Sequence, residues 1–264
     1  MKTENLKILF IGDIVGRPGR SAVREVLPKL IEEKEIDFVI ANGENLAAGK
    51  GMTKEKYDEM LEAGVDYFTS GNHIWANRDI IPYLKEKSVK ILRPANYPSD
   101  CPGQGFVTLE IKGQKVTIIN LLGQVFIPVL TDNPFKISKE IVDDHKDSII
   151  LIDFHAEATS EKIALAHYLD GEVSAIVGTH THVQTADETI LARGTAFISD
   201  LGMCGPADSV LGVEKGIIIR QFLTALPQSH KVAVGPTIFN ACLATIDTKT
   251  RRAVQIERIF KNIK

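Results

Sequence analysis

The sequence predicts one layered α/β domain with two sheets, spanning residues 1–264. Short apolar runs rich in Ile, Val and Phe alternate with segments of helical spacing, which is typical of parallel sheets covered by helices. The second half of the chain contains paired runs joined by short polar turns, as expected of antiparallel strands. No repeat, low-complexity tract or flexible linker divides the chain.

The first half of the chain predicts a βαβαβ unit. Apolar residues recur at helical spacing after the first run, at Val23, Leu27 and Leu30. Thr53 is placed to cap a second helix and Gly64 to end it. Because crossovers between parallel strands are right-handed, this order predicts a parallel sheet. The expected strands are residues 7–11, 36–41 and 65–69, and the expected helices are residues 19–34 and 53–63.

The second half mixes hairpins with single strands and helices. Lys112-Gly113-Gln114 separates two apolar runs and indicates a β-hairpin. A strand pair is expected around Gly194. Residues 214–226 are expected to form a helix, although their isoleucine run also fits a strand. The remaining expected elements are hairpin strands 106–111 and 115–122, strand 148–154, helix 160–169, strand 173–177, and terminal hairpin strands 238–247 and 252–259.

Composition excludes several classes of protein. Hydrophobic residues make up 44% of the chain and charged residues 25%, which is ordinary for a globular protein. The net charge of −3 does not make duplex nucleic acid an obligatory partner, although a nucleotide or short oligonucleotide stays open. Three widely spaced cysteines indicate neither a disulfide framework nor a thiolate zinc site. The sequence shows no signal-peptide pattern and no membrane-spanning run, so we expect a cytoplasmic protein without a membrane partner.

Polar residues gather where the predicted strands end. The sequences FIGD, VIANGEN, YFTSGNH, LIDFH and AIVGTHTH each close an apolar run with carboxylate, amide or imidazole side chains. In open α/β sheets the carboxyl ends of the strands lie along one edge, where ligands bind. We therefore expect these side chains to converge on one site. The candidate metal ligands are Asp13, Glu44, Asn45, Asn72, His155, His180 and His182.

These ligand types favour a centre of two metal ions. Imidazole suits Zn, Fe and Mn, whereas carboxylate and amide oxygens suit Mg and Mn. Two adjacent ions need a bridging ligand, and the Glu44 carboxylate is the candidate because it offers two oxygens and a negative charge. A hydroxide shared by the ions would attack phosphorus in line.

The motifs Asp13, Gly43-Glu44-Asn45, Gly71-Asn72-His73, His155 and Gly178-x-His180-x-His182 resemble those of the calcineurin-like metallophosphoesterase superfamily. Phrases such as FIGDIVGRPGR, ANGENLAAGKG and SDLGMCGP resemble its YmdB-like branch. The resemblance implies a four-layer αββα sandwich with a smaller mixed or antiparallel region in the second half. It also implies a metal-dependent phosphodiesterase that acts on small nucleotide phosphodiesters, with 2′,3′-cyclic nucleotides first.

Two departures from the superfamily pattern agree with this branch. The usual first motif has a histidine at the position of Val15, and the usual second motif has an aspartate at the position of Glu44. Losing one nitrogen ligand favours Fe or Mn, with Mg or Zn still open. By resemblance, His73 stabilises or protonates the leaving oxygen. The implied ligand sets are Asp13, Glu44, Asn45 and His182 for one ion, and Glu44, Asn72, His155 and His180 for the other.

Other polar residues have two interpretations each. Three basic side chains could contact a substrate phosphate or base, although a solvated surface position is the default interpretation for each. They are Arg17, Lys50 and Arg93. Trp75 fits either base stacking or core packing, and Asp200 fits either support of the site or a turn.

Three alternatives to the phosphodiesterase also stay open. They are a phosphomonoesterase, a nuclease, and a nucleotide- or RNA-binding regulator with secondary turnover. Besides a small nucleotide substrate, RNA ends and a second copy of the chain are the expected partners.

Overall fold

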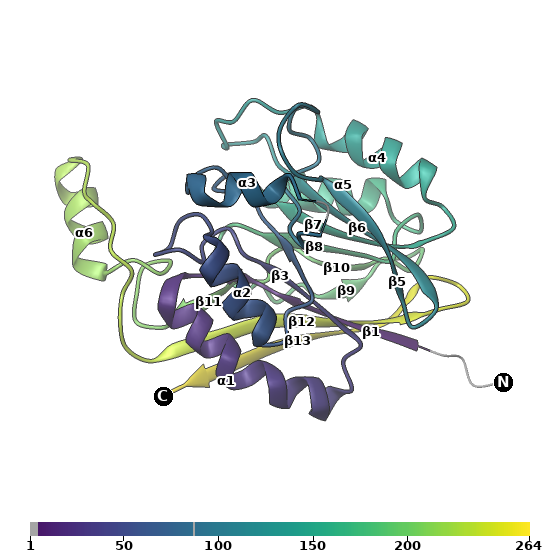
Figure 1. Cartoon of the computed structure of the whole chain (residues 1–264), viewed down its shortest axis with the longest axis horizontal. Coiled ribbons are helices and arrows are strands. Elements are labelled where there is room, and N and C mark those ends of the chain that lie inside the picture. Colours follow the sequence, from purple (N-terminus) through teal and green to yellow (C-terminus); the bar gives the residue numbers. More distant parts are fainter. Residues whose placement is uncertain (1–4, 87) are drawn as a thin grey trace.

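A computed structural model describes residues 5–86 and 88–264 of the chain. Two sheets pack face to face, with helices covering the outer side of each (Figure 1). The first sheet has the order β2-β11-β12-β1-β3-β4, with β13 paired to β12, and the second has the order β5-β6-β7-β8-β10-β9. The predicted αββα sandwich is confirmed.

The first sheet and its helices are formed mainly by the two ends of the chain. Its strands are β1 (Asn5–Ile11), β2 (Asp13–Ile14), β3 (Phe38–Asn42), β4 (Tyr67–Thr69), β11 (Met203–Pro206), β12 (Thr237–Asp247) and β13 (Ala253–Ile263). The helices that pack against it are α1 (Gly16–Lys34) and α2 (Lys54–Glu62).

The middle of the chain forms the second sheet. Its strands are β5 (Phe106–Ile111), β6 (Gln114–Leu122), β7 (Ile149–His155), β8 (Ala175–Thr179), β9 (Thr189–Ile190) and β10 (Ala196–Ile198). The helices that cover it are α4 (Pro134–Asp144) and α5 (Thr159–Tyr168). The short elements η1 (Arg78–Ile80) and α3 (Ile81–Leu84) follow β4, and α6 (Lys215–Thr224) projects from the body of the molecule (Figure 1).

Alternation along the strands explains the layering. In β1, Leu6 and Ile8 face the core between the sheets, whereas Leu9 and Ile11 face the core under α1 and α2. A third core lies between the second sheet and its helices. Strands that are buried on both faces have continuous apolar sequences, and this made them predictable from the sequence.

Most expected elements form, with bounds shifted by a few residues. The hairpin turn tightens to Lys112-Gly113, whose φ values of 47° and 73° belong to the left-handed region required by a type I′ turn. Thr53 caps α2 as expected, accepting from the Lys56 amide. The helix α4 was not predicted, although Asn133 before Pro134 is a helix-start signal, and Asn133 does cap it.

The topology differs from the expectation that the polar strand ends lie along one edge. These strand ends come from both sheets. The strands β1, β3 and β4 run parallel in the first sheet, and β7 and β8 run parallel in the second. The other neighbour of β1 is the antiparallel strand β12, which sequence order does not reveal. Across the described residues, no helix is long and apolar enough to cross a membrane.

Candidate metal centre

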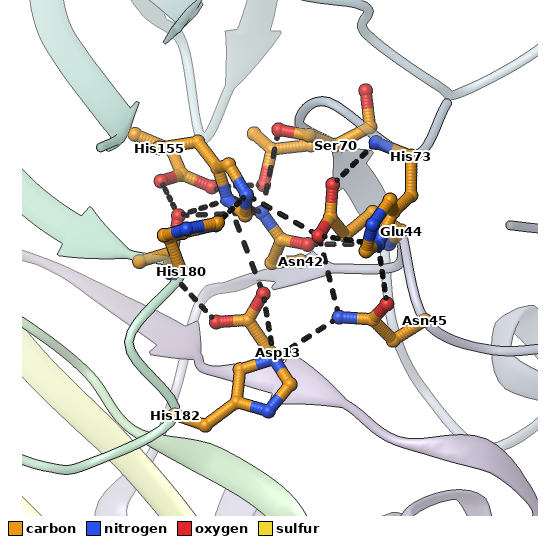
Figure 2. A network of polar contacts seen from close by, with 12 residues as sticks. Asp13, Asn42, Glu44, Asn45, Ser70, His73, His155, His180 and His182 are labelled. Carbon is orange, nitrogen blue, oxygen red and sulfur yellow. Dashed lines mark hydrogen bonds and ion pairs between the residues drawn. The ribbon is translucent and has the colours of Figure 1, made fainter. Parts of the chain in front are cut away.

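The candidate ligands converge where the carboxyl ends of the two sheets meet. Figure 2 shows Asp13, Glu44, Asn45, His155, His180 and His182 close together, and Asn72 joins them through its contact with His155. Asp13 opens β2 directly after β1, and Glu44 with Asn45 follows β3. Asn72 and His73 follow β4 in the first sheet. From the second sheet, His155 is the last residue of β7, and His180 and His182 follow β8.

One group of donors centres on His155. Its Nε2 atom lies 3.0 Å from His180 Nδ1, 3.2 Å from Asn72 Oδ1 and 3.2 Å from Glu44 Oε1. The candidate ligand atoms of Glu44, His155 and His180 all lie within 4.8 Å of one another. Two imidazole nitrogens and two oxygens directed at one point form a donor set suited to a transition-metal dication.

A second group centres on Asp13. Its Oδ2 atom accepts from the His180 amide at 3.1 Å, whereas the buried Oδ1 atom has no hydrogen-bond partner among the described residues. This Oδ1 atom lies 3.9 Å from His182 Nε2, which in turn is 3.1 Å from Asn45 Nδ2. A buried carboxylate oxygen without a partner is costly in a folded protein. The Asp13 Oδ1 atom is therefore suited to bind a cation.

Glu44 lies between the two groups. Its Oε2 atom accepts from the His73 amide at 3.0 Å, while Oε1 is 3.2 Å from His155 Nε2 and 3.4 Å from Asn45 Nδ2. Gly71 makes this approach possible, because a Cβ atom there would lie 2.2 Å from His155 Cδ2 and 2.5 Å from Glu44 Oε2. The geometry suits a carboxylate shared by two sites.

Burial and charge shift the titration of these side chains. Burial disfavours the Glu44 carboxylate, but the His155 charge and hydrogen bond outweigh burial and hold the pKa of Glu44 well below its usual range. The same pairing overcomes burial at His155 and raises its pKa to about 9. Burial raises the pKa of Asp13 to about 6, and burial together with the His155 charge lowers the pKa of His180 to about 3. The protonation states of these buried side chains therefore depend strongly on neighbouring charges.

Four buried residues that the sequence analysis did not assign hold His155 in place. Its Nδ1 atom is 2.9 Å from Thr179 Oγ1, and the Thr179 hydroxyl donates to Asp153 Oδ1 at 2.7 Å. Asp153 also accepts from Thr69 Oγ1 and, at 3.1 Å, from Asn42 Nδ2. Asp153 therefore faces the site. The alternation of β7 was the available signal, because Asp153 and His155 share one face.

The loop after β8 is held in an unusual conformation. His180 and His182 have φ values of 101° and 65°, which non-glycine residues rarely adopt. Asp200 supports this loop by accepting from the Thr181 amide at 3.0 Å, and it pairs with the buried Lys162 at 2.7 Å. Backbone strain kept in place by buried interactions is common at functional sites.

Contacts outside the centre orient both histidines of the GTHTH motif. His182 Nδ1 is 3.0 Å from the Leu211 carbonyl oxygen, which leaves Nε2 facing the Asp13 group. His180 Nε2 is 3.1 Å from Glu157 Oε2, which leaves Nδ1 facing His155. Partners on the outer nitrogen of a histidine commonly fix which nitrogen binds metal.

The remaining candidate residues, for which the sequence allowed two interpretations, lie in different surroundings. Trp75 packs edge-on against Tyr97, with ring centroids 5.6 Å apart, which supports the packing interpretation. Arg93 is buried and donates to the Pro94 carbonyl oxygen, whereas Arg17 is exposed. Lys50 is exposed and lines the same pocket as His73.

Two face-to-face sheets that bring carboxylate, amide and imidazole ligands together at their carboxyl ends define a metallophosphoesterase. Within that class, the chain belongs to the YmdB-like family, whose model matches residues 9–259. The predicted resemblance is confirmed. This fold implies divalent metal ions, and Glu44, His155 and His180 form a candidate site for one.

Known relatives agree with this assignment. The chain is 46% identical over 259 residues to the 2′,3′-cyclic-nucleotide 2′-phosphodiesterase of Bacillus subtilis (strain 168), with 97% of each chain covered. It superposes with a TM-score of 0.94 on the crystal structure of a novel phosphatase from Mycoplasma pneumoniae, at 36% identity over 99% of this chain and 95% of that one. A 5′-nucleotidase precursor from Thermus thermophilus shares the fold alone, with a TM-score of 0.58 at 12% identity, covering 98% of this chain and 55% of that one.

Proposed function

We propose that this protein is a metal-dependent phosphodiesterase that hydrolyses small nucleotide phosphodiesters, with 2′,3′-cyclic nucleotides as its main substrates. The single observation that carries the proposal is the pair of donor groups joined at Glu44, with the unpartnered Asp13 oxygen in one of them. Two adjacent cations suit phosphoryl transfer because they neutralise charge on both the attacking and the leaving oxygen. The name of the Bacillus subtilis relative supports the choice of substrate.

Two ions would be held by unequal ligand sets. Asp13, Glu44, Asn45 and His182 would hold one ion, and Glu44, Asn72, His155 and His180 the other. When bound, the ions supply an activated water molecule and charge neutralisation. The first set has one imidazole and three oxygen-bearing side chains, which favours Fe or Mn over Zn. Asn45 presents Nδ2 to His182 and Oδ1 to His73, so its amide would have to turn over to offer the oxygen to an ion.

His73 is proposed to protonate the leaving oxygen. Its Nδ1 atom is 3.0 Å from Asn45 Oδ1 and 3.2 Å from Glu44 Oε1, which leaves Nε2 as the nitrogen available to substrate. The side chain is partly exposed, as a group that meets substrate must be. Opening a 2′,3′-cyclic phosphate at the 2′ ester expels a ribose oxygen, and a proton from Nε2 would neutralise it.

The decisive assay incubates the purified protein, reconstituted with Mn²⁺ or Fe²⁺, with 2′,3′-cyclic AMP and with p-nitrophenyl phosphate. We expect release of 3′-AMP and no turnover of the aryl monoester. Turnover of the monoester alone would favour a phosphomonoesterase, and cleavage of RNA alone would favour a nuclease. The variant Glu44→Gln should lose hydrolysis. If Glu44→Gln keeps full hydrolysis with metal bound, the proposed bridge is wrong.

A regulator that binds RNA or nucleotide is the competing class of protein. Loss of hydrolysis in Glu44→Gln with an intact cellular effect would favour it. RNA ends that carry a 2′,3′-cyclic phosphate are proposed as additional substrates, because they present the same phosphodiester. A cytoplasmic location is proposed from the three free cysteines, since oxidising compartments favour disulfides.

Association of two or more copies is also proposed, with each chain acting as one domain. The support is α6, a helix with no buried residue. Phe222 and Leu223 on this helix are 82% and 80% exposed, an unusual amount of large apolar surface for a monomer. Light scattering should show an oligomer for the natural sequence and a smaller species for Phe222→Glu. An unchanged mass for Phe222→Glu would exclude this surface.

A further inference from the structure

A pocket of about 540 Å³ lies directly beside the candidate metal centre. His73 and His182, which belong to the candidate centre, also line this pocket, so any group bound there would adjoin a phosphate held at the centre. Its volume falls within the usual range for small-molecule sites, roughly 300–1,000 Å³. The remaining lining residues are Val15, Ala48, Gly49, Lys50, Leu211, Gly212, Val213, His230 and Val232.

The pocket combines apolar walls with a few nitrogen-bearing side chains. Val15, Leu211, Val213 and Val232 give it apolar walls. Among the residues that the structure describes, the polar side chains lining the pocket are those of Lys50 and of the histidines, and none is a carboxylate. Apolar walls with a few nitrogen donors suit a flat heteroaromatic ring that carries hydrogen-bond acceptors.

The chain fixes this wall relative to the metal ligands. The Leu211 carbonyl oxygen lies 3.0 Å from Nδ1 of the candidate ligand His182. Val213 pairs with Val232 in an antiparallel bridge, and the Ala233 amide donates to the Gly212 carbonyl oxygen at 2.9 Å. Val232 lies so close to the loop after β3 that a Cβ atom on Gly49 would be 2.8 Å from Val232 Cγ2. The pocket is therefore tied to the same segments that position His182.

We infer that this pocket binds the nucleobase of the substrate, which extends the proposed function and rests on it. With the cyclic phosphate at the metal centre, the base would lie between the valine and leucine side chains. Lys50 and His230 would donate to ring nitrogens or carbonyl oxygens, which every nucleobase presents. The pocket thus predicts strong preference for a base and only weak discrimination among bases.

The test compares two substrates that differ only in the base. One is 2′,3′-cyclic AMP, and the other is methyl riboside 2′,3′-cyclic phosphate, which keeps the reacting group but lacks the base. Because the baseless substrate buries no apolar surface in this pocket, we expect kcat/KM to be about tenfold higher for cyclic AMP. Val232→Trp fills the pocket and should lower kcat/KM for cyclic AMP much more than for the baseless substrate, so that the preference is lost.

Val234→Trp is the matched control, because Val234 is two residues away and 80% exposed. It should keep the full preference for cyclic AMP. Val213→Phe fills the pocket from the opposite side of the bridge and provides an independent variant if Val232→Trp does not fold, as judged by its thermal transition. We expect Val213→Phe to reduce the preference as well.

The outcomes separate the two proposals. If the natural protein hydrolyses both substrates and the preference survives in the folded pocket variants, the base lies elsewhere and the pocket proposal is overturned. Equal loss on both substrates in those variants would also overturn it, because it would indicate damage to the metal centre. If the natural protein hydrolyses neither cyclic phosphate, the proposed function itself fails, and this inference fails with it.

Discussion

Thr179 Oγ1 lies 2.9 Å from His155 Nδ1, and the Thr179 hydroxyl donates a hydrogen bond to Asp153 Oδ1. The hydroxyl can therefore only accept from the imidazole, which places a ring hydrogen on Nδ1 and keeps Nε2 directed at Glu44, Asn72 and His180. One side chain at the end of β8 thus sets the state of a ligand at the end of β7.

We expect Thr179→Val to weaken metal binding at the His155 group by about 10–100-fold, the usual effect of losing a hydrogen bond behind a ligand. Titration calorimetry with Mn²⁺ measures the affinity directly, without relying on turnover. Thr179→Ser keeps the hydroxyl and should bind Mn²⁺ nearly as tightly as the natural protein. Equal affinity in the valine variant would show that the hydroxyl does not orient His155.

Asp13→Asn should have opposite effects on stability with and without metal. Asp13 is fully buried with one oxygen unpartnered, and burial raises its pKa to about 6. Removing this buried charge should stabilise the protein in a chelator by about 1 kcal/mol, because the cost of burying the carboxylate outweighs its attraction to His182 and His155. In Mn²⁺ the same variant should lose stability relative to the natural protein, since ligand binding stabilises the folded state.

Thermal melting of both proteins, with chelator and with Mn²⁺, measures this reversal. Elemental analysis should also find fewer ions per chain in Asp13→Asn. A variant that is less stable in both conditions would mean that Asp13 contributes to the fold rather than to a cation site.

Gly71→Ala should abolish metal binding. The new methyl group would lie 2.2 Å from His155 Cδ2 and 2.5 Å from Glu44 Oε2, and neither buried side chain has room to retreat. We expect a loss of stability of about 1–3 kcal/mol from overpacking, together with loss of bound Mn²⁺. Elemental analysis and chemical unfolding measure the two effects separately.

Gly216→Ala is the control for this substitution. Gly216 lies in α6, and a Cβ atom there meets nothing within 4 Å. Alanine is the better helix former, so this variant should be slightly more stable and should bind metal normally. Similar behaviour of both alanine variants would remove the steric argument at Gly71.

Much of the fold was predictable because its strands are buried on both faces. The runs around Leu9, Ile40 and Ile152 had to be strands, since each is too short and too apolar for a surface helix. The pairing of β1 with β12 was not predictable, because its partners Leu9 and Leu243 lie far apart in sequence and local patterns carry no information about such contacts.

The sequence by itself determined which side chains gather at the candidate centre, because ligand-type residues end apolar runs at Asp13, Glu44, Asn72, His155 and His180. Only the tertiary structure decided how they meet. Two sheets, rather than one edge, bring them together, and this packing directs Asp153 behind His155 and leaves one Asp13 oxygen unpartnered. The physical reason is that side-chain chemistry is local, whereas orientation and burial depend on contacts between distant segments.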